Sequence, residues 1–168
     1  MLVPPRLMAT ARMVPLPIAA RVADLLLQQV LKIHPKLFDR LGDHARTRFA
    51  FIPSDFPFAF SIRPVERTLR ACRNGSPIAA DATITGPLVL MLALAEGRVD
   101  GDAVFFARRL LVSGDMEAVL ALRNALDDNE IDLVKTAARF AGPMARSVTR
   151  AFEIIRTEAL KRQGLSWN

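Results

Sequence analysis

The sequence predicts an α+β protein in which helices cover one face of a β-sheet. Apolar and polar residues alternate with a period of two over several short runs between residues 46 and 85, which is typical of strands. Helical patterns flank these runs on both sides. Apolar residues make up 51% of the chain, enough for a substantial core, and a length of 168 residues corresponds to one domain.

The first predicted helix spans residues 18–33 and follows a proline- and methionine-rich arm. Its apolar positions recur at helical spacing and form a wide face beside a narrow polar stripe. Pro35 ends the helix. So wide a face favours burial against a sheet, and a lipid or partner surface is the alternative. We divide the chain into an N-terminal arm (1–19), a central domain (20–128) and a C-terminal extension (129–168).

The central domain begins with a predicted hairpin. Residues 46–51 and 58–63 place phenylalanine and isoleucine at alternating positions, and Pro53-Ser54-Asp55 supplies the turn between them. A third short strand is predicted at residues 67–72, where Asn74-Gly75 follows as a tight turn. These strands give the predicted sheet a face unusually rich in phenylalanine.

The period changes after a fourth predicted strand at residues 78–85. Gly86-Pro87 opens a helix, with proline at its first position, and Gly97 closes it. Its body, residues 88–95, is apolar on all sides, so we expect it to be buried or to line a cavity.

Three further elements complete the predicted domain. They are a short helical turn at residues 101–107, a last strand marked by Leu110 and Val112, and a helix from Met116 to Leu126. Asp115 precedes this helix, where an acidic residue caps and complements its positive end.

The C-terminal extension reads as two helices, at residues 130–141 and 143–162. The second is basic and amphipathic, a pattern found in membrane-surface segments, and docking on the domain is the alternative. The two ends of the chain also carry its whole excess charge of +6, because each end is +3 and residues 44–129 are neutral. Basic ends around a neutral centre predict an anionic partner such as a membrane surface. The predicted membrane contacts are Arg12, Arg146, Arg150 and Phe152.

Catalytic and cofactor signatures are missing from the sequence. The chain has two histidines and one cysteine, which disfavours a triad, an iron–sulfur site or a zinc site. Asp100-Gly101-Asp102 lacks the remainder of a calcium loop. The sequence therefore predicts no enzyme, no cofactor and no metal.

Two other classes are disfavoured. Phe49-Ala50-Phe51-Ile52 matches part of an RNA-recognition strand, but the basic and glycine positions before it do not match, so no nucleic-acid partner is expected. The longest uninterrupted apolar run has eight residues, whereas about 20 are needed to span a bilayer. We expect a cytoplasmic protein, and peripheral contact with the inner membrane is left open.

The stretch from Asp81 through Leu126 resembles the sterol carrier protein 2 family. The shared order is a strand, Gly86, a helix ending at Gly97, a short helix, a strand closing on Gly114-Asp115, and a last helix. The segment at residues 86–128 is similar to a bacterial branch of lipid-binding accessory factors in oxygen-independent ubiquinone biosynthesis.

The resemblance implies a five-stranded sheet covered by helices around a hydrophobic tunnel, with the N- and C-terminal amphipathic helices as additions. It implies binding of isoprenoid quinone precursors or phospholipids without catalysis, beside iron–sulfur hydroxylases and other ubiquinone-pathway enzymes. A lipid-free scaffold is the main alternative, an RNA-binding module is a weaker one, and a homodimer through the amphipathic flanks is left open. The predicted lipid-binding residues are Phe49, Phe51, Phe58, Phe60, Ile62, Ile84, Leu88, Met91, Leu92, Phe105, Leu110, Val112 and Leu120.

Overall fold

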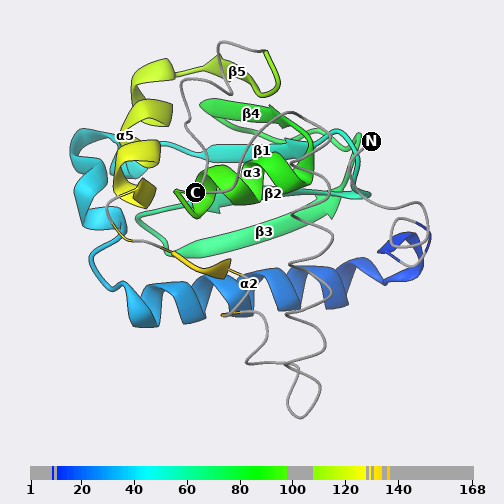
Figure 1. The fold of residues 1–168 in the computed structure, drawn as a ribbon. Helices are drawn as coiled ribbons and strands as arrows, with labels where there is room; N and C mark the ends of the chain where they lie inside the picture. The colour runs from blue at the N-terminus through cyan, green and yellow to red at the C-terminus, as the bar shows by residue number, and fades with distance from the viewer. Residues whose placement is uncertain are drawn as a thin grey trace.

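The fold is seen in a computed structural model, which describes residues 9, 11–97, 108–127, 129, 131–133 and 136. These residues form a five-stranded mixed sheet with helices packed against it (Figure 1). The α+β class predicted from the sequence is therefore confirmed. The predicted turn at 101–107 and the predicted helix at 143–162 lie outside the described residues, as does most of the predicted helix at 130–141.

The sheet has the strand order β3-β2-β1-β4-β5. Its strands are β1 (Phe49–Pro53), β2 (Phe58–Arg63), β3 (Thr68–Arg73), β4 (Ala82–Gly86) and β5 (Leu111–Gly114). The chain forms the hairpins β1–β2 and β2–β3 and then returns to place β4 beside β1 on the other side. This β1–β4 pair is parallel, whereas the remaining neighbours are antiparallel.

The strand register gathers the large apolar side chains on one face of the sheet. Phe49 lies opposite Ile62 and Ala82, and Phe51 lies opposite Phe60 and Ile84. Because directly paired residues share a face, these side chains form one surface. The alternation in the sequence predicted this phenylalanine-rich face, and the register confirms it.

The opposite face of the sheet carries smaller and more polar side chains. Ala50 lies opposite Ser61 and Thr83, and Cys72 on β3 lies opposite Ala59. Ala50 and Ala59 on this face are nevertheless buried, at 0% and 1% exposed.

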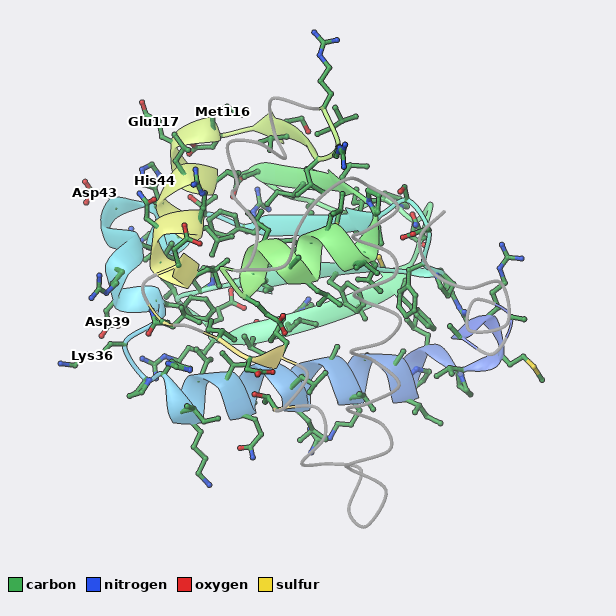
Figure 2. All side chains as sticks on the ribbon, in the orientation of Figure 1. Lys36, Asp39, Asp43, His44, Met116 and Glu117 are labelled. Atoms are coloured by element: carbon green, nitrogen blue, oxygen red, sulfur yellow. The ribbon has the colours of Figure 1, made fainter. Side chains whose placement is uncertain are left out.

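Helices α3 (Leu88–Ala95) and α5 (Met116–Asp127) cover the apolar face. In Figure 1, α3 lies across the middle of the sheet and α5 lies beside one end of it. Leu90 and Ala93 of α3 are fully buried. Ala118 of α5 is also fully buried, and Leu122 of α5 is 4% exposed. At the start of α5, Met116 and Glu117 point away from the sheet (Figure 2).

Helix α2 (Leu16–Ile33) runs along the edge strand β3 and buries Leu27, Val30 and Leu31 (Figure 1). The amide of Gln28 donates a hydrogen bond to the carbonyl oxygen of Arg67 at 2.8 Å. A 3-10 helix, η1 (Phe38–Arg46), then leads into β1 and packs against α5. The helix α2 thus packs against the sheet as its apolar face predicted, although Ile18, Val22 and Ile33 of that face are 45–55% exposed.

Several boundaries differ from the sequence predictions. Pro53 ends β1 instead of forming the turn, because its register partner is Gly86 of β4. The fourth strand starts at Ala82, since the pairing between β1 and β4 begins there. Pro87 lies just before the first residue of α3 and not at its first helical position. The 3-10 helix was not anticipated, because its apolar residues are too few for a clear period.

None of the helices in the described ranges is both long enough and apolar enough to cross a bilayer.

Candidate functional site

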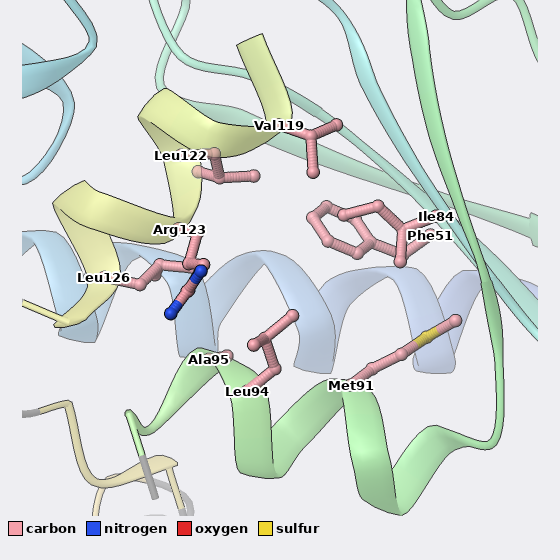
Figure 3. A pocket seen from close by; sticks show the side chains of 9 residues that line it. All are labelled: Phe51, Ile84, Met91, Leu94, Ala95, Val119, Leu122, Arg123 and Leu126. Atoms are coloured by element: carbon pink, nitrogen blue, oxygen red, sulfur yellow. The ribbon is translucent and has the colours of Figure 1, made fainter. Parts of the chain in front are cut away.

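A small apolar cavity lies between the apolar face of the sheet and helices α3 and α5 (Figure 3). Its volume is about 20 Å³, which is room for roughly one water molecule. The lining side chains are Phe51, Ile84, Met91, Leu94, Ala95, Val119, Leu122, Arg123 and Leu126.

The sheet supplies the floor of this cavity. Phe51 and Ile84 are register partners on the central strands β1 and β4, so the strand pairing itself holds them side by side. Ile84 is 3% exposed.

The two helices supply the walls through their helical period. Met91, Leu94 and Ala95 are spaced at i, i+3 and i+4 on α3, so they share one side of that helix. The lining residues of α5 are spaced at i, i+3, i+4 and i+7, and they are Val119, Leu122, Arg123 and Leu126.

The start of α3 is fixed by a buried carboxylate. Asp55 is 1% exposed, and its Oδ1 accepts a hydrogen bond from the backbone N–H of Leu88 at 2.8 Å. Pro87 precedes the helix and supplies no side-chain cap of its own. Asp55 therefore satisfies one of the unpaired N–H groups at the helix start and orients α3 over the sheet.

One charged residue, Arg123, lies among the nine that line the cavity. Its Nε is 3.4 Å from Oδ2 of Asp127, one helical turn further along α5, and its side chain is 19% exposed. In Figure 3 its guanidinium lies on the side of Ala95 and Leu126, whereas Phe51 and Ile84 occupy the other side. The cavity thus has a charged side and an apolar side.

The predicted lipid-binding residues fall into four groups in the structure. Phe51, Ile84 and Met91 line the cavity. Phe49, Phe58 and Leu110 are buried but do not line it, and Phe60, Ile62, Leu88, Leu92 and Val112 are half-buried and also lie outside its lining. Leu120 is 47% exposed and outside the cavity. Phe105 lies outside the described residues.

A separate aromatic cluster explains why Phe58 and Phe60 do not reach the cavity. The Phe56 ring meets the Phe58 ring edge-on at 5.7 Å and stacks with Phe60 at 6.4 Å between centroids. The guanidinium of Arg73 lies over Phe58, 4.7 Å from its centroid, and donates to the carbonyl oxygen of Val14 at 3.0 Å. Phe58 and Phe60 thus pack against Phe56, and Arg73 links this cluster to the N-terminal segment.

Most of the α5 wall was missed by the sequence analysis. The spacing of Val119, Leu122 and Leu126 was a usable signal, but Leu120 and Ala121 are also apolar and blur the period. Arg123 interrupts the apolar pattern, so nothing in the sequence placed it at a cavity. Among the predicted membrane contacts, Arg12 is exposed, and Arg146, Arg150 and Phe152 lie outside the described residues.

The lining offers contacts for hydrocarbon and no obvious catalytic group. Within the described ranges, no group of three or more His, Cys, Asp or Glu side chains could hold a metal ion. Burial raises the pKa of the Cys72 thiol, and Cys72 lies on the opposite face of the sheet from the cavity. His44 Nδ1 is 3.7 Å from Oδ2 of Asp115, outside the cavity at the junction of η1 and α5 (Figure 2).

The protein is therefore of the α+β class, with a mixed sheet, two helices that cover its apolar face, and an apolar cavity between them. The SCP-2 sterol transfer family model matches residues 27–127. The chain belongs to this family.

The chain is similar to several solved structures at low sequence identity. A ubiquinone synthesis protein named UbiJ-SCP2 has a TM-score of 0.55 and 20% identity, covering 71% of this chain and 98% of that chain. Sterol carrier protein domain 2 of Helicoverpa armigera has a TM-score of 0.46 and 18% identity, covering 64% and 85%. Sterol carrier protein 2 of Yarrowia lipolytica, in its apo form, has a TM-score of 0.46 and 16% identity, covering 64% of this chain and 88% of that chain. No curated protein matches the chain by sequence.

Proposed function

We propose that this protein is a non-catalytic lipid-binding factor that holds an apolar chain between its sheet and helices α3 and α5. The observation that supports this most strongly is the apolar cavity at that position in a chain of the SCP-2 sterol transfer family. Transfer of hydrocarbon from water into such a site is favourable by about 0.8 kcal/mol per CH₂ group.

The proposal includes an opening of the site. A volume of about 20 Å³ is far too small for a prenyl or acyl chain, so the ligand has to displace the side chains that meet there. Met91 is unbranched and adapts readily to a new packing partner. We propose that α3 and α5 separate when the chain enters, because the contacts between them at the cavity are made by side chains and not by paired backbone.

We further propose a role in oxygen-independent ubiquinone biosynthesis. The support is the resemblance of residues 86–128 to the UbiT-type accessory factors, together with a shared fold with a protein named for ubiquinone synthesis. In this role the protein holds polyprenylated quinone intermediates or phospholipid and presents them to the iron–sulfur hydroxylases. It works in the cytoplasm against the anionic inner membrane, which its basic ends contact.

The test of lipid binding is native mass spectrometry of the purified full chain, followed by organic extraction and lipid identification. We expect a co-purifying phospholipid or prenylated ring. Val119→Phe puts a larger side chain into the cavity, and Leu120→Phe makes a similar change at a position outside it. Val119→Phe should reduce the bound lipid, and Leu120→Phe should leave it unchanged.

An apo mass with no lipid uptake from anionic liposomes would contradict the carrier function and favour a lipid-free scaffold. The pathway role has its own test, namely the ubiquinone content of cells that lack the protein. We expect a loss of ubiquinone during growth without oxygen and normal levels with oxygen. Equal levels in both conditions would contradict the pathway role and leave lipid binding standing.

A further inference from the structure

We infer that Arg123 is the head-group anchor of the cavity and that it selects lipids with an anionic oxygen head, a carboxylate or a phosphate, next to the hydrocarbon chain. This inference rests on the proposed lipid binding and adds the class of ligand. It is carried by the position of a guanidinium at one side of a cavity whose other lining residues are apolar.

The first step of the argument concerns the direction of Arg123. The residue lies on the same side of α5 as Val119, Leu122 and Leu126, so its stem belongs to the cavity wall. In Figure 3 the nitrogen atoms lie beside Ala95 and Leu126, away from Phe51 and Ile84. The side chain is 19% exposed and its Nε is buried, so the methylene groups and part of the guanidinium lie against apolar surface.

The second step concerns the ligand that fits such a wall. An apolar tail directed toward Phe51 and Ile84 would leave its head at the side where Arg123 lies. A guanidinium is planar, stays charged and recognises carboxylate and phosphate oxygens with paired N–H donors. A neutral hydroxyl head would gain much less there, so the geometry favours an anionic lipid over its alcohol analogue.

The third step concerns the acidic groups of the same region. Asp127 Oδ2 lies 3.4 Å from Arg123 Nε, and Glu96 Oε1, at the end of α3, accepts a hydrogen bond from the backbone N–H of Leu133 at 3.0 Å. Asp127 therefore compensates the arginine charge in the closed site. An anionic lipid head has to share the guanidinium with Asp127. This competition lowers the affinity for the anionic lipid and keeps the preference over a neutral one.

The test compares palmitate with hexadecanol, two probes that share one chain length and differ in the head. Binding to the full-length protein is measured by competition against a fluorescent lipid probe, above the ordinary pKa of the fatty carboxyl group. We expect the wild type to bind palmitate at least about tenfold more tightly than hexadecanol, the gain of one charge-assisted interaction. The variant Arg123→Gln should lose this preference and keep its affinity for hexadecanol.

The matched control is Arg70→Gln, at an exposed arginine on the opposite face of the sheet, and it should keep the preference. Arg123→Lys, which keeps the charge and loses the planar donor pair, should give an intermediate preference.

Each remaining outcome decides between the two proposals. Equal binding of palmitate and hexadecanol by the wild type overturns the anchor, and this measurement needs no variant to fold. An unchanged preference in a folded Arg123→Gln protein overturns it as well. Failure of the wild type to bind either probe contradicts the proposed lipid binding itself.

Discussion

At the residue scale, Asp81 and Gly114 lie where the ends of β1, β4 and β5 meet. Arg48 donates from its backbone N–H and its Nε to Oδ2 of Asp81, at 2.9 and 3.0 Å, and from Nη2 to Oδ1 at 2.6 Å. The carbonyl oxygen of Asp81 accepts from the N–H of Asp115 at 2.9 Å. Gly114 has a φ of +85° and lies against the same carbonyl. These contacts fix how β1, β4 and β5 meet.

The first prediction concerns Gly114. A Cβ at this position would overlap the carbonyl oxygen of Asp81, in addition to the strain of a positive φ. Gly114→Ala should therefore lower the free energy of unfolding by about 2–5 kcal/mol. Gly75, with a φ of +93° and open space around it, is the matched control, and Gly75→Ala should cost only about 1–2 kcal/mol. Urea unfolding of both variants measures the difference, and equal losses would contradict the contact with Asp81.

The second prediction concerns acid stability. The hydrogen bonds from Arg48 hold the pKa of Asp81 at about 2, below its ordinary value of 3.8. Because the folded-state pKa is the lower one, the ionised pair stabilises the fold above about pH 4 and loses this effect as the pH falls toward 2. Asp81→Asn should therefore be less stable than the wild type at neutral pH and should show a weaker dependence on pH in this window.

The measurement is urea unfolding of both proteins at a series of pH values. Since both side chains are about two-fifths exposed, water screens the pair and the difference should be modest. Parallel stability curves for the two proteins between pH 4 and 2 would show that Asp81 does not contribute to the acid transition.

At the scale of elements, α3 depends on a residue from outside itself. All eight of its residues are apolar, and it has no acidic residue in its first turn and no basic residue in its last. A helix of this length is marginal in water on its own, so its stability comes from packing and from the cap that Asp55 provides.

The third prediction follows from this cap. Asp55→Ala removes the acceptor for the N–H of Leu88 in a buried setting, and it should cost about 1–3 kcal/mol of unfolding free energy. Asp55→Asn keeps an acceptor oxygen and should cost less. Hydrogen exchange of the α3 amides should accelerate more in Asp55→Ala than in Asp55→Asn. Identical exchange in the two variants would argue against the cap.

At the scale of the whole molecule, packing leaves little space between the sheet, α3 and α5 in the part of the chain that the structure describes. The core runs from α2 through the sheet to α3 and α5, and the cavity among these elements is about 20 Å³. A domain packed in this way keeps its stability in the absence of ligand, and a bound chain then competes with its own side chains for the same space.

The fourth prediction compares two leucines of α5 that lie two residues apart. Leu122 is 4% exposed and lines the cavity, whereas Leu120 is 47% exposed. Leu122→Ala should cost about 2–5 kcal/mol of unfolding free energy, and Leu120→Ala should change it by less than about 0.5 kcal/mol. Thermal and urea unfolding check both values. A similar cost for the two would mean that Leu120 is covered in solution.

Much of the fold could be predicted, because the signals are local. The alternation around Phe49, Phe51, Phe58 and Phe60 identified strands and their apolar face, and glycine and proline marked the start and end of α3. The fourth strand was drawn too long, because alternation continues past the point where β1 offers a pairing partner. Pro53 was placed in a turn because its pairing with Gly86 depends on a strand from elsewhere in the chain.

The candidate site was predicted only in part. Of the residues predicted to bind lipid, Phe51, Ile84 and Met91 line the cavity, whereas Leu120 is exposed and lies outside its lining. Arg123 was not among the predicted residues. Several apolar residues in a row on α5 allow more than one face to look buried. The choice between those faces is made by the direction in which the helix meets the sheet.

By itself the sequence determined the α+β class, the phenylalanine-rich face and the family resemblance, because period, turn residues and motif order are properties of the chain alone. Tertiary structure decided which of those phenylalanines meet α3 and α5 and which stack on one another beside Arg73. It also decided that the cavity is small and has an arginine in its lining. The volume of a cavity and the positions of its lining residues depend on how separate elements pack, and a local sequence pattern does not determine that packing.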